Sequence, residues 1–311
     1  MPAPVSKFAI YAALIVLAGS MLFPFYWMAT TSFKNAADVF SVEPKIIPGR
    51  SLAQRVSEDT ALHAWFFEPT TAHYPELFTW RREVLDSASA SSGPRFHLLD
   101  GFGRFLANNT FYALSITLGQ VLTSSLAAFA FARLRFPGRD KLFLAYLGTM
   151  MIPITITMIP SYILLRELGW VDSYKAVILP SLFTAYGTFM LRQFFMTIPR
   201  EIEDAARIDG CNEFGLYWRI MLPLSTPALA TLVIIVFVGS WRSFMWPLIV
   251  CSSEDTFNLP LGLTMFRSLH GDPQWSLLMA GSVVMTLPLV IVFVFGQRYF
   301  VEGIRLGAVK G

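Results

Sequence analysis

Residues 105–132, FLANNTFYALSITLGQVLTSSLAAFAFA, run for 28 residues without a charged side chain. Arg104 precedes the run and Arg133 follows it. Roughly 20 helical residues cross a hydrocarbon core of about 30 Å, so the run is long enough to span a bilayer. It predicts a transmembrane helix.

The composition of the whole chain indicates the same class. Of its 311 residues, 54% are hydrophobic and 14% are charged, whereas an ordinary soluble domain is about 45–50% apolar and about 25% charged. Disordered, collagen-like and coiled-coil proteins are excluded by the same numbers. A net charge of +3 without a dense Lys/Arg cluster argues against nucleic-acid binding. We therefore expect an all-α membrane protein.

Charge-free runs between successive charged residues predict six transmembrane helices. The fourth run is short and is extended by Phe194 and Phe195. The first could be a signal peptide, but Phe23, Phe25 and Tyr26 stand where a cleavage site needs small residues, so we expect a retained helix. The predicted spans are 8–33, 105–132, 142–165, 176–191, 220–241 and 273–297.

The placement of Lys and Arg in short loops predicts the orientation. Twelve basic residues fall on the side of the N-terminus and three on the other side, so both termini are expected in the cytoplasm. The twelve are Lys7, Arg133, Arg135, Arg139, Lys141, Arg192, Arg200, Arg207, Arg219, Arg298, Arg305 and Lys310, and the three are Arg166, Lys175 and Arg267.

The spans divide the chain into four parts. Residues 1–33 are the N-terminus and first helix, and 34–104 are an extracytoplasmic insertion whose aromatic residues favour a small folded subdomain over a partly ordered loop. Residues 105–300 are the core, with five further helices and a cytoplasmic loop at 197–223. Residues 301–311 are a cytoplasmic tail.

The sequence offers no catalytic, metal or cofactor site. It contains no GxxxxGK[ST] phosphate loop and no HExxH pair, and all four histidines lie in predicted outer loops. The predicted spans hold no acidic residue, which disfavours a proton-coupled carrier. Cys211 and Cys251 are expected on opposite sides of the membrane, so no disulfide is expected between them.

The loop between the fourth and fifth spans, IPREIEDAARIDGCNEFGLYWRIMLP at 198–223, has its own helix signals. Pro199 suits the start of a helix, and the acidic residues that follow it suit the first turn. Gly210 predicts a left-handed cap, and a second short helix is expected at 213–221. Two short helices around a glycine, joined to a span, predict a lever that docks on a soluble partner.

Asp204-Ala205-Ala206, then Asp209-Gly210 and, nine residues on, Ile220-Met-Leu-Pro223 resemble the EAA motif, E-A-A-x-x-x-G-x9-I-x-L-P, of ABC-importer permease subunits. Asp204 stands where that family usually has Glu. AFARLRFPG at 130–138, MIP at 151–153, IP at 159–160 and the segment 297–311 resemble the carbohydrate-uptake branch, the maltose-type inner-membrane permeases.

The resemblance implies the type I ABC importer permease fold and a set of partners. These would be a second, homologous permease subunit forming a heterodimer, two ATP-binding cassette ATPase subunits, an extracytoplasmic solute-binding protein and membrane lipid. ATP and Mg would be bound by the ATPase subunits, and this chain would be a non-catalytic subunit with no cofactor of its own. The location would be a bacterial or archaeal inner membrane.

The resemblance also implies site residues. The loop would be the coupling helix, with contacts to the ATPase at Glu203, Asp204, Ala205, Ala206, Asp209 and Gly210. The C-terminal tail of the family reaches toward the same interface, so Gly307, Lys310 and Gly311 are further candidates, with a frayed terminus as the alternative.

Residues for the solute path follow from chemistry that suits sugars, aromatic faces and hydroxyl-binding groups. The candidates are Trp241, Arg242, Ser243, Trp246 and Gln120. Arg242 could instead extend to the outer interface, the tryptophans could pack or form an interface belt, and Gln120 could bond between helices.

The expected function is translocation of a sugar or related carbohydrate, driven by ATP hydrolysis on the partner subunits. A polyol or glycerol phosphate is an alternative solute, since Arg242 suits an anion. A non-transporting membrane scaffold for a cytosolic ATPase and an autonomous secondary carrier are the competing classes.

Overall fold

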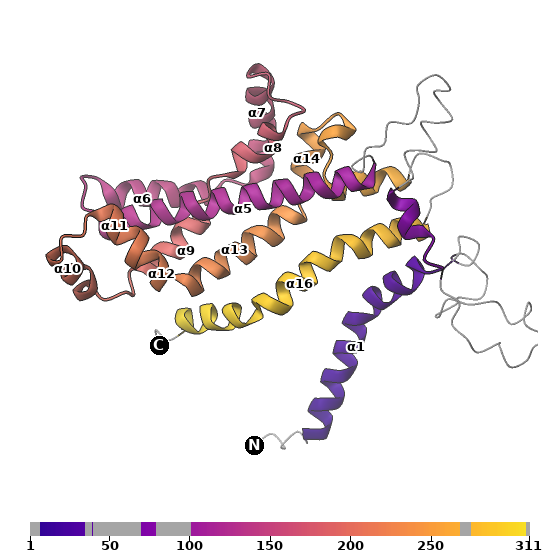
Figure 1. Ribbon diagram of the computed structural model, residues 1–311, viewed down its shortest axis with the longest axis horizontal. Helices are drawn as coiled ribbons and strands as arrows, with labels where there is room; N and C mark the ends of the chain where they lie inside the picture. Colours follow the sequence, from indigo (N-terminus) through magenta and orange to yellow (C-terminus); the bar gives the residue numbers. More distant parts are fainter. Residues whose placement is uncertain (1–6, 35–38, 40–69, 79–100, 268–274, 309–311) are drawn as a thin grey trace, which may run out of the picture. The chain divides into compact units, whose positions relative to one another are not determined.

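The computed structural model describes residues 7–34, 39, 70–78, 101–267 and 275–308, with side chains up to Gln297 in the last range. Every regular element in these ranges is a helix, as expected for an all-α protein (Figure 1). The chain divides into two compact units. Unit 1 is Met1–Gly103 with Gly262–Leu287, and unit 2 is Arg104–Leu261 with Pro288–Gly311.

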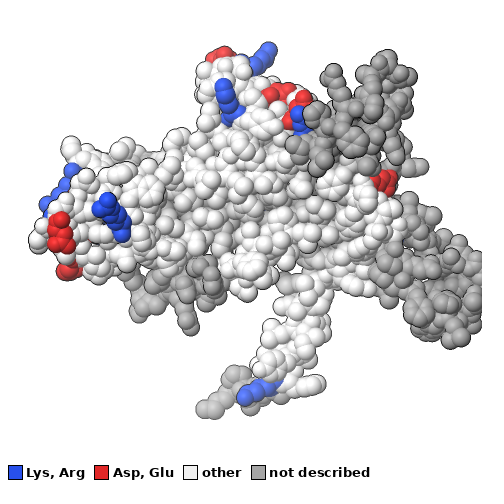
Figure 2. All heavy atoms as spheres, in the orientation of Figure 1, with Lys and Arg blue, Asp and Glu red and all other residues white. Residues whose placement is uncertain are grey.

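Three described helices are long and apolar enough to cross a membrane unaided. They are α1 (Lys7–Ser32), α5 (Phe102–Arg133) and the Trp275–Gln297 part of α16 (Trp275–Ala308). They correspond to the first, second and sixth predicted spans. Within unit 2, Figure 2 shows charged side chains near α10 and α11 and near α7, with none visible over the stretch between, as a membrane belt requires.

The third and fifth predicted spans are broken helix pairs. α6 (Arg139–Gly148) with η2 (Thr149–Met151) meets α7 (Ile154–Glu167) at 98°, because Pro153 holds extended backbone at the break. The segment Glu213–Leu224 meets α13 (Thr226–Trp241) at 79°, at Ser225 between two prolines. Counting each pair as one span gives five spans in the described part of the chain.

The fourth predicted span, 176–191, is not one helix. It divides into α8 (Tyr174–Ile178), η3 (Leu179–Ser181) and α9 (Ala185–Phe195). Pro180 lies in η3 and Thr184 is extended, with φ −139° and ψ 125°, so helical hydrogen bonding is interrupted twice. The fourth predicted span is therefore interrupted, and the total of six spans stays a prediction.

The core of unit 2 forms where α5 packs on α9 and on the segment before α13. Phe129 of α5 contacts Tyr217, with ring centroids 5.5 Å apart, and Ser125 shares a 2.7 Å hydrogen bond with the Tyr217 hydroxyl. A Cβ at Gly187 would lie 2.6 Å from Ser124 Oγ, so only glycine allows α9 to approach α5 this closely. The remaining helices of unit 2 are α10 (Arg200–Ile208), α11 (Glu213–Leu216), η4 (Tyr217–Met221), α12 (Leu222–Leu224), α14 (Met245–Val250) and η5 (Glu254–Thr256).

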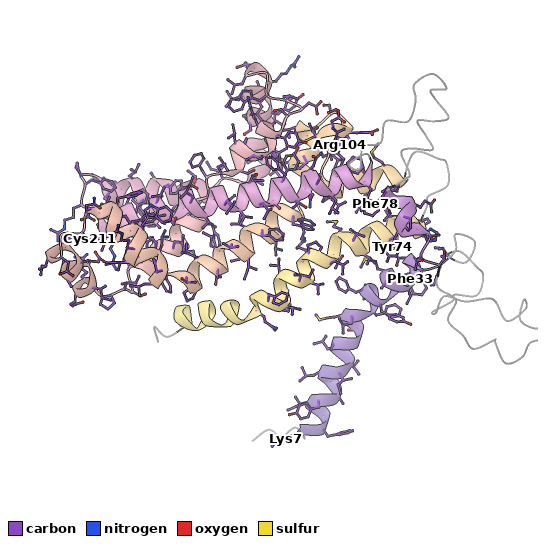
Figure 3. All side chains as sticks on the ribbon, viewed as in Figure 1. Lys7, Phe33, Tyr74, Phe78, Arg104 and Cys211 are labelled. Carbon is purple, nitrogen blue, oxygen red and sulfur yellow. The ribbon has the colours of Figure 1, made fainter. Side chains whose placement is uncertain are left out.

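Unit 1 joins the end of α1 to a short helix at 73–78, which belongs to the predicted insertion. Ser32 and Tyr74 share a 2.9 Å hydrogen bond, and Tyr74 packs on Phe33 (Figure 3). Phe78 meets Phe102 edge-on at 5.4 Å. Most of the predicted 34–104 subdomain, residues 35–38, 40–69 and 79–100, lies outside the described residues. α15 (Leu259–Leu263) and η6 (Thr264–Arg267) lead into this unit.

An ordered turn at Asp172 joins the loop after α7 to the segment after α14. Asp172 Oδ1 accepts hydrogen bonds from the backbone of Ser252 (2.9 Å) and Ser253 (3.0 Å) and from the hydroxyls of Ser253 (3.0 Å) and Thr256 (2.6 Å). Burial raises the pKa of Asp172, but these hydrogen bonds outweigh it and lower the pKa to about 2. The carboxylate is therefore a stabilising anion.

Asp172→Asn is expected to lower the free energy of unfolding of the detergent-solubilised chain by about 1–2 kcal/mol at pH 7. Asn tolerates the φ of 60° at this position, so the decrease in the free energy of unfolding is due to the lost negative charge and not to backbone strain. The pKa is depressed on folding, so the wild-type advantage is full above about pH 4 and is lost as pH falls toward 2. Thermal unfolding against pH measures this, with Glu167→Gln as the control because Glu167 is exposed and makes no ion pair among the described residues. An advantage equal at pH 7 and pH 2 would contradict the assignment.

Candidate functional site

The loop motif folds as two short helices around a glycine, as expected. α10 begins after Pro199, carries Glu201 and Glu203 in its first turn, and ends in a Schellman cap. Gly210 has φ +84°, its N–H bonds to the Arg207 carbonyl (3.1 Å), and the next N–H bonds to the Ala206 carbonyl (2.9 Å). Nothing lies within 4 Å of a Cβ added at Gly210, so backbone strain alone selects glycine.

The second helix continues into the fifth predicted span. Asn212 caps α11 by accepting a 2.7 Å hydrogen bond from the Gly215 N–H. The chain then passes through a π-helical turn, η4, and α12 to the bend before α13. α11 is therefore joined to the start of α13 by two short helical segments and a bend.

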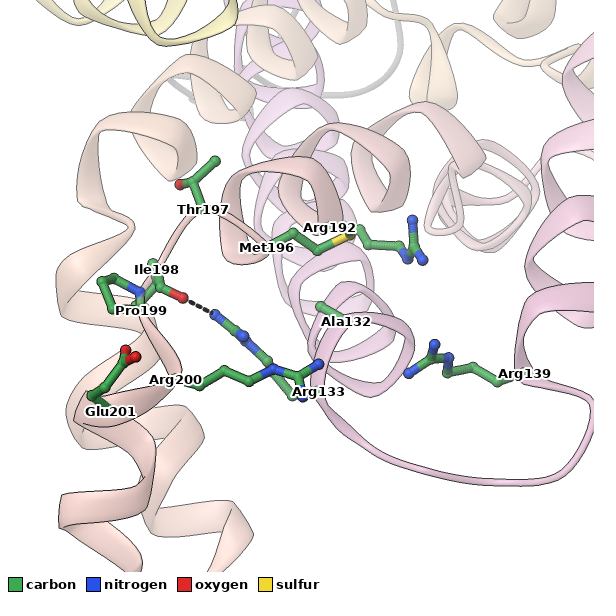
Figure 4. A pocket seen from close by; sticks show the side chains of 10 residues that line it. All are labelled: Ala132, Arg133, Arg139, Arg192, Met196, Thr197, Ile198, Pro199, Arg200 and Glu201. Atoms are coloured by element: carbon green, nitrogen blue, oxygen red, sulfur yellow. Dashed lines mark hydrogen bonds between the residues drawn. The ribbon is translucent and has the colours of Figure 1, made fainter. Parts of the chain in front are cut away.

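A buried ion pair ties α10 to the end of α5. Arg133 Nε lies 2.8 Å from Glu203 Oε1, and both side chains are 3% exposed. These two atoms are not aligned as a hydrogen bond, so the contact is an ion pair. Arg133 also donates to the carbonyls of Phe195 and Ile198, the latter at 2.6 Å (Figure 4). One guanidinium thus joins three segments: the end of α5, the end of α9 and the start of α10.

A second arginine fixes α10 against α11. Arg207 contacts Glu213 at 3.0 Å, Asp204 at 3.3 Å and Glu203 at 3.5 Å. Its hydrogen bond to Glu213, with the negative charges of the three carboxylates, raises the pKa of Arg207. The group is partly exposed, so these contacts set geometry more than stability.

The six predicted docking residues do not share one surface. Asp204, Ala205, Asp209 and Gly210 are exposed, whereas Glu203 is 2% and Ala206 is 9% exposed. The last two face inward, so their side chains are not available to a partner as predicted. Four exposed apolar side chains that were not singled out from the sequence lie on the same segment: Ile202, Ile208, Phe214 and Trp218.

These apolar side chains are unusual on a segment that projects from predicted spans. Ile208 is 86% and Phe214 is 65% exposed, and Phe214 meets the Trp218 ring edge-on at 6.2 Å. Exposed apolar groups with charged neighbours mark interaction surfaces. The sequence could have indicated these residues, because they are apolar positions on the face of the short helices that is otherwise polar.

The predicted solute-path residues are mostly used for packing inside unit 2. Trp241 is 2% exposed and stacks on Phe237 at 5.5 Å. The indole of Trp246 donates to the Ala176 carbonyl (3.0 Å), and the amide of Gln120 donates to the Ser181 carbonyl (2.5 Å).

The other two candidates lie where α13 ends. The carbonyl of Ser243 accepts a 2.6 Å hydrogen bond from Asn258. Arg242 is exposed, and its guanidinium makes no ion pair among the described residues. Arg242 is the candidate that keeps a free charged group.

The remaining predictions concern the tail and metals. Gly307 lies near the end of α16, and Lys310 and Gly311 lie outside the described residues. Within the described ranges, no three His, Cys, Asp or Glu side chains gather as metal ligands would.

Comparison with known proteins extends these observations. The family described as "Binding-protein-dependent transport system inner membrane component" matches residues 120–306. The arabinooligosaccharides transport system permease protein AraQ of Halalkalibacterium halodurans is 42% identical over 67% of this chain and 74% of its own. The sn-glycerol-3-phosphate transport system permease protein UgpE of Yersinia enterocolitica is 32% identical over 94% of both chains.

A solved structure has the same fold. It is described as a bacterial ABC transporter involved in the import of the acidic polysaccharide alginate, and one of its chains superposes with a TM-score of 0.74 at 20% identity, covering 95% of this chain and 99% of that one. The expected importer permease fold is confirmed. With its apolar helices and its loop motif, the chain belongs to the family of inner-membrane components of binding-protein-dependent transport systems, the non-catalytic permease subunits of ABC importers.

Proposed function

We propose that this permease moves a carbohydrate or a closely related solute inward, and that the α10–α11 segment is its docking surface for an ATPase subunit. The observation that carries the proposal is the pairing of an exposed apolar and acidic face on this segment with buried anchors behind it. Docking contacts are assigned to Asp204, Ala205, Asp209 and Gly210, together with Ile208, Phe214 and Trp218.

The structure supports a mechanical route from that surface to the spans. A displacement of α10 acts on α5 through Arg133–Glu203, and a displacement of α11 acts on α13 through η4 and α12. Glu203 and Ala206 are thus positioning residues inside the lever. Rigid-body rocking of helices about such connections is the usual basis of alternating access.

The proposed complex contains a second permease subunit, two ATPase subunits that bind ATP and Mg, and an extracytoplasmic binding protein. Both termini and the α10–α11 segment face the cytoplasm, as the distribution of Lys and Arg predicts. The 307–311 tail is a second proposed contact with the ATPase.

The solute is proposed from the relatives and from Arg242. The relatives named above serve arabinooligosaccharides and sn-glycerol-3-phosphate, so a sugar is proposed, with glycerol phosphate as the second candidate. Arg242 favours the anionic candidate, because its guanidinium has no carboxylate partner among the described residues and can pair with a phosphate.

Gly210→Val is expected to reduce ATP-driven solute uptake at least about tenfold, because a β-branched residue is strained by about 1–2 kcal/mol or more at positive φ and shifts α11 against α10. The measurement is uptake into proteoliposomes that contain the complete importer. Gly138→Val is the matched control, because Gly138 also has a positive φ (+77°) and open space around it. Equal losses in both variants would refute the lever.

Glu203→Leu is expected to lower the free energy of unfolding by about 3–5 kcal/mol, since it leaves Arg133 charged and buried without its partner. Adding Arg133→Met should recover part of that loss, because the double variant buries no charge. Denaturant titration measures the free energy of unfolding of the wild type, both single variants and the double variant, which together form a double-mutant cycle. If the losses of the two single variants add up to the loss of the double variant, the ion pair does not couple α5 to α10.

Arg242→Gln is expected to decrease uptake of glycerol 3-phosphate at least about tenfold, while uptake of a neutral oligosaccharide changes little. Competition uptake in the same proteoliposomes compares the two solutes. Arg166→Gln, another exposed arginine outside the proposed path, serves as the control. Unchanged uptake of both solutes would remove Arg242 from the path.

A further inference from the structure

An open pocket of about 420 Å³ lies beside the start of α10. Its walls come from the end of α5, the start of α6, the end of α9 and the α9–α10 turn (Figure 4). Four arginines line it, Arg133, Arg139, Arg192 and Arg200, against a single acidic residue, Glu201. Of these, Arg133 belongs to the proposed connection between α10 and α5, whereas Arg139, Arg192 and Arg200 have no part in it.

Two of the four guanidiniums already have acidic partners. Arg133 is paired with Glu203, and Arg139 Nε lies 3.1 Å from the exposed Asp140 carboxylate. Their charges are largely neutralised, so they shape the pocket more than they charge it.

The other two lack a carboxylate among the described residues. Arg192 donates from Nε to the Phe131 carbonyl (3.3 Å) and stacks over the Phe143 ring at 4.1 Å, which leaves its two terminal nitrogens available. Arg200 makes no ion pair with a described residue. In Figure 4 the Glu201 carboxylate lies beside Pro199, on the opposite side of the view from Arg139 and Arg192.

The position of the pocket limits the chemical class of ligand that it can bind. Its wall includes Ala132, the last residue of the charge-free run in α5, so the pocket sits where that helix leaves the hydrocarbon. Phosphate groups are the anions found at that depth, and a guanidinium presents paired donors that match phosphate oxygens.

We propose that this pocket binds a phosphate group, held by Arg192 and Arg200 with Arg139 at its edge. The phosphate comes from an anionic phospholipid headgroup or from a soluble phosphate. Because Arg200 is the first residue of α10 and Arg192 belongs to α9, the bound anion links the docking segment to the helix that precedes it. The residues of this site differ from the candidate solute-path residues and from the docking contacts assigned above.

The test is calorimetric titration of the purified full chain, in a neutral detergent, with short-chain phosphatidylglycerol and, in a separate arm, with inorganic phosphate. Saturable binding is expected, weakened at least about tenfold in Arg192→Gln/Arg200→Gln, because each lost charge-assisted hydrogen bond corresponds to roughly a factor of ten. Binding of phosphatidylglycerol alone identifies a lipid headgroup, and equal binding of inorganic phosphate identifies a soluble source.

Arg219→Gln is the matched control, because Arg219 is an exposed arginine predicted on the same side that does not line the pocket. Arg200→Gln alone keeps the test decisive if the double variant does not fold, since Arg200 makes no ion pair with a described residue. No saturable binding in either arm, unchanged binding in the Arg200 variant, or an equal loss in the Arg219 variant would overturn the proposal.

Discussion

The buried ion pair between Arg133 and Glu203 is the contact on which the arrangement of α5, α9 and α10 in unit 2 depends. Two charges that are each 3% exposed persist only when they neutralise each other and their remaining groups find partners. Arg133 meets that requirement by also bonding the Phe195 and Ile198 carbonyls, which closes the end of α9 against the start of α10. A flexible linker could not hold α10 in one orientation, whereas this pair can.

That anchor explains why the proposed docking face is shaped as it is. Glu203 and Ala206 are three residues apart and share one face of α10, so anchoring that face turns Asp204, Ala205 and Ile208 outward. The Schellman cap at Gly210 then sets the direction of α11. The same fixed start of α10 places Arg200 in the wall of the basic pocket that Arg192 also lines.

Much of the fold could be predicted because charges are scarce. The runs at 8–33, 105–132 and 273–297 appear as α1, α5 and α16, since a long charge-free run admits few other structures. The breaks at Pro153 and in the 176–191 segment could not be predicted with the same certainty. A proline within a span can bend it or be accommodated, and neighbouring helices decide which.

The site was predictable in its pattern and less so in its orientation. The motif located the glycine turn and both short helices, but it did not reveal that Glu203 faces Arg133, a residue 70 positions away in the sequence. The solute path shows the same limit, because Gln120 and Trp246 satisfy distant carbonyls that no local pattern identifies.

Because Arg133 and Glu203 join them, α10 and the end of α5 are expected to move as one body. The most direct measurement is the distance between spin labels at Glu201 on α10 and Leu126 on α5, in a chain whose two cysteines are replaced by serine, within the assembled importer before and after ATP binding. One narrow distance distribution that does not change on ATP binding is expected, while labels placed across the transporter change their separation. A shift or broadening of the α10–α5 distance on ATP binding would contradict it.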